Sequence, residues 1–213
     1  MKRVGEICRK HNVYVVSDEI HCDLVREGYT HLSYLVANPQ DSDRTIVCTA
    51  PCKTFNVTGL QVSNIFIPNP AIRLKFLHEI AGAGYSQLNM LGLVACKAAY
   101  AGGEEWLAEC RNYLEGNLRF IKTFLAKKLP EIKLIEPEGT YFAWLDFSAL
   151  GLSDRELDEL ILSKAGLWLD AGYIFGKGGS GFQRLAYSCT RATLTEALNR
   201  LFYAIHGKWD VAH

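Results

Sequence analysis

The chain has 213 residues with 23 basic and 23 acidic side chains, so its net charge is zero at neutral pH. This balance argues against a nucleic-acid or anionic-membrane surface as the main function. No apolar stretch approaches the roughly 20 residues that span a bilayer, and acidic and polar residues appear too early for a signal peptide. We therefore expect a soluble protein of one large or two small domains, with neither nucleic acid nor membrane as a partner.

The first half of the chain alternates helical patterns with short apolar runs. Residues 13–16 form a continuous apolar run, which is typical of a strand buried on both faces of a parallel sheet. Further strands are predicted at 45–49 and 62–67, and helices at 2–11, 70–81 and 87–101. Pro70 suits the first turn of its helix. These elements predict an α/β unit.

The second half reads differently. A long amphipathic helix is predicted over 104–128, and we expect it to join two domains. Short strands are predicted after it at 132–135, 141–146, 167–169 and 184–188, with helices at 153–165 and 192–207. Ser153 and Glu156 have the spacing of a capping box at the start of the first of these helices. This part predicts a small α+β domain.

The seven cysteines are scattered and form no Cys-x-x-Cys pair. Several lie in apolar runs, where cysteine behaves as a small hydrophobic residue. We therefore expect reduced thiols in a cytoplasmic protein. His21, Cys22 and Asp23 are consecutive and lack the spacing of zinc ligands, so no metal site is expected.

Residues 176–181 satisfy the pattern G-x-G-x-x-G. That pattern binds a dinucleotide only when a strand precedes it and a helix follows, because the helix N-terminus holds the pyrophosphate. Here a strand-like run follows instead. We interpret the segment as a mobile loop.

Lys53 and Asp18 are the strongest candidates for chemistry. Each follows a predicted strand, and the carboxyl ends of parallel strands are where α/β proteins place their sites. A lysine held there can act as a Schiff-base nucleophile, and an acid can pair with a pyridinium nitrogen, as pyridoxal phosphate requires. A surface lysine and a carboxylate that caps the next turn remain the structural alternatives.

Two further residue types are weaker candidates. His21 follows Asp18 by three positions and could face the same crevice, although a structural histidine is the alternative. Arg184 begins an apolar run and could hold a carboxylate with its planar fork, with Arg191 behind it. Arginines at strand starts are also common on surfaces.

The sequence around these candidates resembles a known family. Residues 17–24 and 50–61 are similar to motifs of fold-type-I pyridoxal-phosphate enzymes of the class I/II aminotransferase superfamily. Within it they look most like the MalY/PatB-type cystathionine β-lyase, or C–S lyase, branch. Similar stretches follow in family order at 139–146, 172–176 and 182–191. The resemblance covers nearly the whole chain but only the C-terminal part of the family chain.

The resemblance implies the α/β fold of pyridoxal-phosphate-dependent transferases. Residues 1–103 would form the C-terminal portion of the cofactor-binding large domain, with a mostly parallel sheet and helices. Residues 104–213 would form the linking helix and a small α+β domain. The implied cofactor is pyridoxal 5'-phosphate, and the implied substrate is an amino acid.

Residue roles also follow from the resemblance. Lys53 is expected to bind the cofactor covalently and to move the substrate's α-proton, and Asp18 to pair with the pyridinium nitrogen. The remaining expected contacts are His21, Thr49 and Cys52 to the cofactor, and Arg184, with Arg191 as a fallback, to the substrate carboxylate.

Three functions remain open at this point. The first is β-elimination from cystathionine or a similar amino acid, which yields a thiol, pyruvate and ammonia. The second is transamination, which shares the early steps. The third, from another class, is an inactive remnant that serves as an oligomeric or partner-binding module, because the chain begins in the middle of the family's large domain. A homodimer or a complementing subunit is expected as partner.

Overall fold

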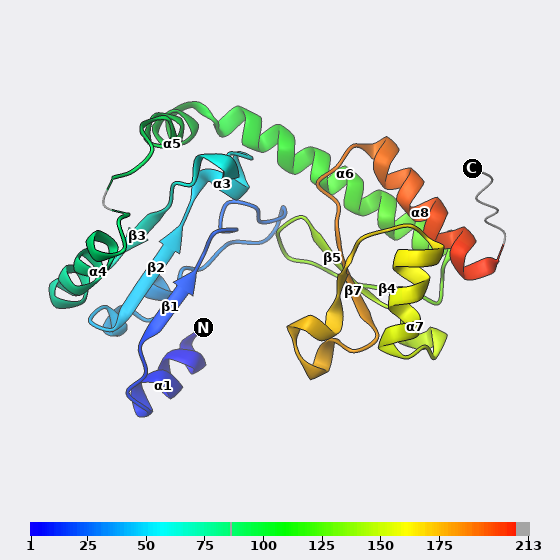
Figure 1. Ribbon diagram of the computed structural model, residues 1–213, viewed down its shortest axis with the longest axis horizontal. Helices are drawn as coiled ribbons and strands as arrows, with labels where there is room; N and C mark the ends of the chain where they lie inside the picture. The colour runs from blue at the N-terminus through cyan, green and yellow to red at the C-terminus, as the bar shows by residue number, and fades with distance from the viewer. Residues whose placement is uncertain (86, 208–213) are drawn as a thin grey trace. The chain divides into compact units, whose positions relative to one another are not determined.

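The computed structural model describes residues 1–85 and 87–207, and the chain divides into two compact units (Figure 1). The first unit comprises Met1–Glu109 and the second Cys110–His213. The division falls within the long helix α6 (Glu104–Lys128). The family domains expected at 1–103 and 104–213 stay a prediction.

A three-stranded sheet organises the first unit (Figure 1). Its strands, in spatial order, are β1 (Val15–Asp18), β2 (Thr45–Thr49) and β3 (Asn64–Phe66). β1 and β2 run parallel, whereas β3 runs antiparallel to β2. The link before β3 contains the short helix α3 (Pro51–Thr54) and a 3-10 turn, but no long helix that would carry the chain back for a parallel strand.

The helices predicted at 2–11, 70–81 and 87–101 are confirmed within a few residues. Asn69 caps one of them by accepting hydrogen bonds from the backbone of Ala71 and Ile72, and Pro70 occupies its first turn as expected. The helices of this unit, besides α3 and the start of α6, are α1 (Lys2–Lys10), α2 (Tyr34–Ala37), α4 (Pro70–Gly82) and α5 (Met90–Gly102), with 3-10 turns at Pro39–Asp41 and Thr58–Leu60.

The strand predicted at residues 13–16 differs from the one observed. β1 begins only at Val15, and it is not buried on both faces, since Val16 is 66% exposed and Tyr14 before the strand is 69% exposed. The physical reason is that β1 lies at the edge of the described sheet, with β2 as its neighbour on one side only. An apolar run does not reveal whether its strand is central or at an edge.

The second unit is built on a four-stranded antiparallel sheet (Figure 1). The strands in spatial order are β4 (Lys133–Ile135), β5 (Phe142–Asp146), β7 (Phe182–Ala186) and β6 (Asp170–Ala171). Its helices are the rest of α6, α7 (Asp154–Asp158), a π-helix (Glu159–Lys164) and α8 (Arg191–His206), with 3-10 turns at Ser148–Leu150, Gly172–Phe175 and Lys177–Gly179.

One face of this sheet forms the core of the second unit. Ala143 and Leu145 of β5 and Leu185 of β7 are at most 3% exposed, and they alternate with half-exposed residues. Leu118 of α6 and Leu198 of α8 are fully buried in the same unit. The other face of the sheet is therefore the one available for a site.

Two predictions in this unit were wrong in detail. The apolar run 167–169 is not a strand: the Leu167 N–H donates to Ile161 O at 2.9 Å, which ties the run to the π-helix, and Trp168 is 92% exposed. The helix predicted at 153–165 is one α-helical turn followed by the π-helix. The capping box of Ser153 and Glu156 is confirmed.

The glycine-rich segment 176–181 is followed by β7 and not by a helix, as predicted. It forms a 3-10 turn against the preceding one, and Gly172 and Gly179 pack backbone to backbone. A Cβ atom on either glycine would collide with the other's backbone, so the sequence needs glycine at both positions.

Candidate active site

Lys53 lies in α3, which begins just after β2 ends. Ala50 is extended and buried, and Pro51 takes the first helical position, where its fixed φ angle suits a helix start. The Phe55 N–H donates to Pro51 O at 2.8 Å, and Asn56, with a φ of 56°, ends the helix. The chain therefore holds the half-buried Lys53 on a single tight turn at the end of the strand.

Asp18 is the last residue of β1 and lies opposite Cys48 of β2. Because β1 and β2 are parallel, their carboxyl ends share one edge of the sheet, where Thr49 ends β2 and α3 follows with Lys53. The exposed Asp18 also accepts a hydrogen bond from Ile20 N at 3.1 Å, so it caps the next turn as well. The structure brings Asp18, Thr49 and Lys53 to the same edge.

The turn after β1 is tied to α3 by a hydrogen bond that the sequence did not predict. Thr54, next to Lys53 and 1% exposed, donates from Oγ1 to Asp23 Oδ2 at 2.9 Å. His21 and Cys22 are half-buried in this turn. Burial and the Asp23 carboxylate raise the pKa of the Cys22 thiol to about 11, so the thiol stays neutral. The segments that carry Asp18 and Lys53 thus form one connected edge.

Glu19 anchors the same turn from the other side. It is 7% exposed, and its Oε1 accepts from Ser17 Oγ at 2.9 Å, Ser33 Oγ at 3.0 Å and Tyr34 N at 2.9 Å. Its Oε2 lies 2.9 Å from His31 Nε2. Burial alone would raise the pKa of Glu19, but these hydrogen bonds outweigh it and lower the pKa. The residue next to Asp18 is therefore a fixed anion in a fixed position.

Cys52, expected to contact the cofactor, is 9% exposed in α3. Behind α3, the Phe55 ring lies 5.5 Å from that of Tyr100 and 5.9 Å from that of Trp106. These ring contacts hold the end of α3 against α5 and the start of α6. The expected roles of Thr49, Cys52 and His21 as cofactor contacts stay predictions.

Arg184 belongs to β7 in the second unit and lies on the half-exposed face of the sheet. It is opposite Trp144 on β5 and Asp170 on β6. Asp170 Oδ2 accepts hydrogen bonds from its Nε at 3.0 Å and its Nη2 at 2.8 Å. The rings of Phe142 and Phe175 lie 4.2 and 4.7 Å from its Cζ. The guanidinium is thus held in place on an open face.

Arg191, the fallback for the same role, makes contacts that are structural. It is the first residue of α8, and its Nε donates to Asn117 Oδ1 at 2.9 Å. Asn117 is fully buried and donates to the carbonyls of Tyr187 and Cys189, both at 2.9 Å. The arginine therefore joins the start of α8 to α6, and Asn117 joins α6 to the segment after β7. Arg184 is the better candidate for a substrate carboxylate. A polar residue at helical spacing from the apolar positions Leu114 and Ile121 was the available signal for Asn117.

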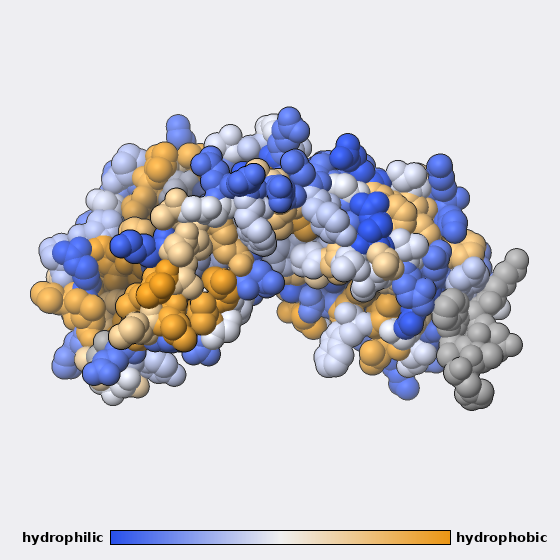
Figure 2. Space-filling model, turned by 90° about the horizontal axis from the view of Figure 1, so that it is seen from above, coloured by the Kyte–Doolittle hydropathy of each residue, from blue (hydrophilic) through white to orange (hydrophobic). Residues whose placement is uncertain are grey.

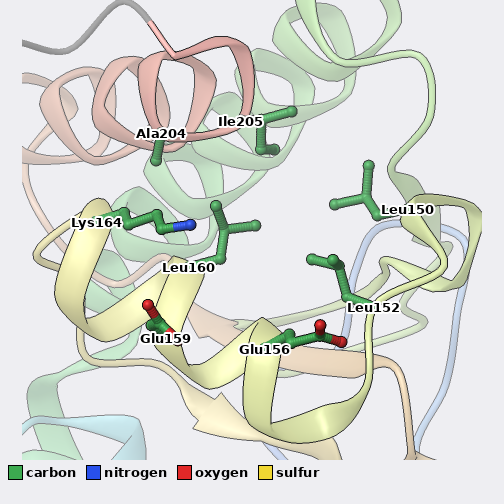
Figure 3. Close-up of a pocket in the computed structure, with 8 residues that line it drawn as sticks. All are labelled: Leu150, Leu152, Glu156, Glu159, Leu160, Lys164, Ala204 and Ile205. Carbon is green, nitrogen blue, oxygen red and sulfur yellow. The ribbon is translucent and has the colours of Figure 1, made fainter.

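A cavity of about 460 Å³ in the second unit is separate from these residues (Figure 3). Figure 3 shows Leu160 and Lys164 of the π-helix facing Ala204 and Ile205 of α8 across it. Carboxylates from Glu156 and Glu159 also line it. It contains none of the predicted site residues.

Within residues 1–85 and 87–207, no group of three or more His, Cys, Asp and Glu side chains is arranged to hold a metal ion. Over the same residues, no helix is both long enough and apolar enough to cross a bilayer.

Comparison with known proteins shows the fold and the family of the chain. A solved pyridoxal-phosphate-bound putative aminotransferase from Clostridium difficile 630 is 41% identical, with a TM-score of 0.92, over 96% of this chain and 53% of its own. Cystalysin from Treponema denticola, which contains pyridoxal 5'-phosphate, is 37% identical with a TM-score of 0.92, over 97% and 52%. The α/β fold expected from the resemblance is confirmed.

Among curated proteins, cystathionine beta-lyase PatB of Bacillus subtilis (strain 168) is 42% identical over 95% of this chain and 52% of its own length. The chain thus spans about half the length of the curated relatives it matches. The family profile described as aminotransferase class I and II matches residues 1–201, and the chain belongs to that family.

Proposed function

We propose that this chain carries the lysine, acid and arginine of a pyridoxal-phosphate-dependent C–S β-lyase that acts on cystathionine or related cysteine-type amino acids. The reaction breaks the bond between Cβ and sulfur and consumes water. Its products are a thiol, pyruvate and ammonia. The identity of 42% to a cystathionine beta-lyase supports this reaction over others of the family.

The observation that carries the proposal is the parallel pairing of β1 and β2. It sets Asp18 beside Cys48, so that the turn after β1 and helix α3 occupy one edge of the sheet. The hydrogen bond between Thr54 and Asp23 connects these two segments directly. An acid and a lysine from separate parts of the chain are thereby supported by the same local structure.

The donor set at this edge fits pyridoxal phosphate. A primary amine can bind an aldehyde covalently, and an exposed carboxylate can hold a proton on a ring nitrogen. When bound, the cofactor supplies an electron sink for the pair of electrons freed at the substrate's α-carbon. Lys53 and Asp18 are the residues of this edge that would hold it.

Three residues of the chain would have separate roles in the reaction. Asp18 would keep a proton at the ring nitrogen of the bound cofactor. The Lys53 amine would take the α-proton of the substrate, and the thiol would leave from Cβ with a proton. Arg184 would bind the α-carboxylate of the substrate.

Absorbance with added pyridoxal phosphate tests the proposal. The wild-type chain is expected to show a saturable band of bound cofactor that Lys53→Ala abolishes. Lys75→Ala, which removes an exposed lysine from α4 of the same unit, is the matched control and should keep the band. A band that survives Lys53→Ala would contradict the lysine assignment. A wild type without any band would contradict cofactor binding.

Transamination is the alternative reaction, and the solved relative from C. difficile described as a putative aminotransferase supports it. Both reactions share the removal of the α-proton, so their residues do not separate them. Incubation with cystathionine decides: pyruvate and thiol indicate the lyase, whereas transfer of the amino group to an added 2-oxo acid indicates the aminotransferase.

The exposed apolar surface of the first unit favours association as a further property. Leu74 of α4 is 68% exposed, and Met90, Leu91 and Val94 of α5 are 76%, 69% and 61% exposed. Figure 2 shows apolar residues, in orange, gathered over the unit drawn on the left. Contiguous exposed apolar surface of this kind marks an interface. We propose a second copy of this chain as its occupant.

Sedimentation of the purified chain tests this assignment. The wild type should sediment as a dimer, and Leu91→Glu should shift it toward the monomer. The matched control Lys97→Glu changes charge elsewhere on the same helix and should not shift it. A monomeric wild type would contradict self-association and would point to a complementing chain, the other partner expected from the sequence.

We further propose that the protein works in the cytoplasm. All seven cysteines are free thiols. Reduced cysteines are the rule in that compartment.

A further inference from the structure

We infer that Asp170 is a positioning residue for Arg184, which it holds so that one edge of the guanidinium faces the substrate. The inference rests on the proposed function, in which Arg184 binds the α-carboxylate. Asp170 itself would not touch the substrate. It would act by fixing the direction in which Arg184 offers its donors.

The first observation is the pattern of donors that Asp170 uses. A guanidinium has five N–H donors in one plane. Asp170 Oδ2 takes one from Nε at 3.0 Å and one from Nη2 at 2.8 Å, which occupies one side of the fork. The edge formed by Nη1 and Nη2 keeps three N–H groups. Among the described residues, Asp170 is the one hydrogen-bond acceptor of this side chain, so that edge is open to a carboxylate.

The second observation is the way the sheet aligns these residues. Trp144, Arg184 and Asp170 lie opposite one another on β5, β7 and β6, so all three project from the same face. Strand pairing therefore fixes the separation of Asp170 from Arg184. A register slip by one residue would send Arg184 into the core face instead.

The third observation is the aromatic surround. The rings of Phe142 and Phe175 lie within 4.7 Å of the Arg184 Cζ. Phe175 in turn meets Trp144 edge-on at 5.6 Å, and Trp144 stacks on Phe182 at 5.5 Å. Contacts with ring faces restrict the guanidinium plane, while Asp170 restricts its rotation within that plane. Together they fix a side chain that is otherwise rich in rotamers.

Fixing Arg184 in advance has a predictable effect on binding. A carboxylate that binds an ordered arginine does not have to freeze its rotamers, and each immobilised side chain of this kind changes affinity about 3- to 10-fold. The Asp170 charge acts in the opposite direction, because it weakens the attraction of Arg184 for a second anion. The positioning effect is proposed to be the larger of the two.

Three variants distinguish the positioning of Arg184 by Asp170 from the effect of the Asp170 charge. Asp170→Ala removes both the acceptor and the charge, whereas Asp170→Asn keeps an acceptor oxygen and removes the charge. Asp158→Ala is the matched control, since Asp158 accepts from Tyr173 OH at 2.8 Å and does not contact Arg184. All three are made in the full chain without cofactor.

Propionate is the probe, and the Arg184 Nε–H resonance in a ¹⁵N NMR spectrum is the readout, assigned by its loss in Arg184→Lys. The dissociation constant for propionate should rise about 3- to 10-fold in Asp170→Ala and stay within about twofold in Asp170→Asn and Asp158→Ala. Propionamide, which lacks the carboxylate, should shift the resonance in none of them.

Several results would overturn the inference. These are a propionate affinity in Asp170→Ala that is unchanged or tighter, an Asp170→Asn variant as weak as Asp170→Ala, and a wild-type Arg184 that ignores propionate. Failure of the proposed function is seen separately, in the cofactor absorbance, because the propionate titration uses no cofactor. A circular dichroism spectrum unlike the wild type's would show that Asp170→Ala misfolds, in which case Asp170→Leu, which also lacks an acceptor, takes its place with the same expected loss.

Discussion

The two units of this chain stabilise themselves in different ways. In the second unit the buried residues are mostly leucine, isoleucine and phenylalanine from α6, α8 and the sheet, and one sheet face is closed. In the first unit α4 has no buried residue and α5 has only Gly92, while leucines of both helices are exposed. What is buried there includes charged groups, Glu19 and Asp41.

The predicted cofactor residues lie in the first unit, which has less apolar packing. The first unit keeps its chain path through a few charged anchors, and the predicted cofactor residues lie next to one of them. Asp41 shows the principle: it is fully buried, and its carboxylate accepts from Arg9 Nη1 of α1 at 2.9 Å and from Tyr34 OH of α2 at 2.8 Å. Its backbone carbonyl accepts from Thr45 Oγ1 at the start of β2 at 2.8 Å. The second unit is stabilised by apolar packing on one face of its sheet, and Arg184 lies on the other, open face.

The largest effect is expected from removing the buried anchor of the first unit. Asp41→Ala leaves the buried Tyr34 hydroxyl and the one-third-exposed Arg9 without their acceptor, and the loss of two hydrogen bonds to a charged group costs about 3–4 kcal/mol. Hydrogen exchange measured by mass spectrometry should show faster exchange in peptides of residues 1–109 and unchanged exchange in 110–207. Equal loss of protection in both units would contradict their independence.

Truncation of a core side chain in the second unit should destabilise that unit. Leu118→Ala in α6 removes a fully buried side chain, and we expect a loss of about 3 kcal/mol in the second unit. Leu91→Ala, at a position that is 69% exposed in the first unit, should change the monomer's stability by less than about 0.5 kcal/mol. Urea unfolding of the two variants at low protein concentration measures the difference. Similar losses of stability in both variants would refute the contrast in packing between the units.

A smaller effect is expected at the link between α3 and the turn after β1. Thr54→Val keeps the side-chain shape but removes the donor to Asp23, at a cost of about 1–2 kcal/mol. Thr58→Val is the control, because its hydroxyl makes only a long contact of 3.4 Å to Cys52 O. Both are compared by thermal unfolding, and equal melting temperatures would show that the link contributes no stability.

The smallest effect concerns pH. The pKa of Glu19 is lowered from 4.5 in the folded chain, so its contribution to stability is complete above about pH 4.5 and is lost as the pH falls through the lowered pKa. Acidification should therefore destabilise the first unit, and Glu19→Gln should reduce that pH dependence. Urea unfolding at pH 6 and pH 4 measures it. A pH dependence that persists unchanged in Glu19→Gln would exclude this carboxylate as its source.

The elements were largely predictable because their signals are local. Helical periodicity located α6, Pro70 marked the start of α4, and the Ser153 capping box located α7. Whether a strand is central or at an edge depends on its neighbours, which explains the error at β1. The run 167–169 has the composition of a strand, yet its hydrogen bonding is set by the π-helix before it.

For the candidate site, sequence reasoning proposed the residues but did not predict the contacts that hold them. Lys53, Asp18 and Arg184 lie in recognisable motifs, and their placement at strand ends or on the open sheet face agrees with the expected chemistry. Thr54 with Asp23, and Asp170 with Arg184, are pairs of residues 31 and 14 positions apart. The fold brings such pairs together, and no local sequence pattern predicts them.

The most direct test of the account is to locate the covalent attachment of pyridoxal phosphate. The full chain is incubated with the cofactor, reduced with borohydride and analysed by peptide mass spectrometry. We predict that the adduct forms on Lys53 in preference to every other lysine. Free lysine should prevent it only when present in large excess. An adduct spread evenly over exposed lysines such as Lys75, or none at all, would contradict it.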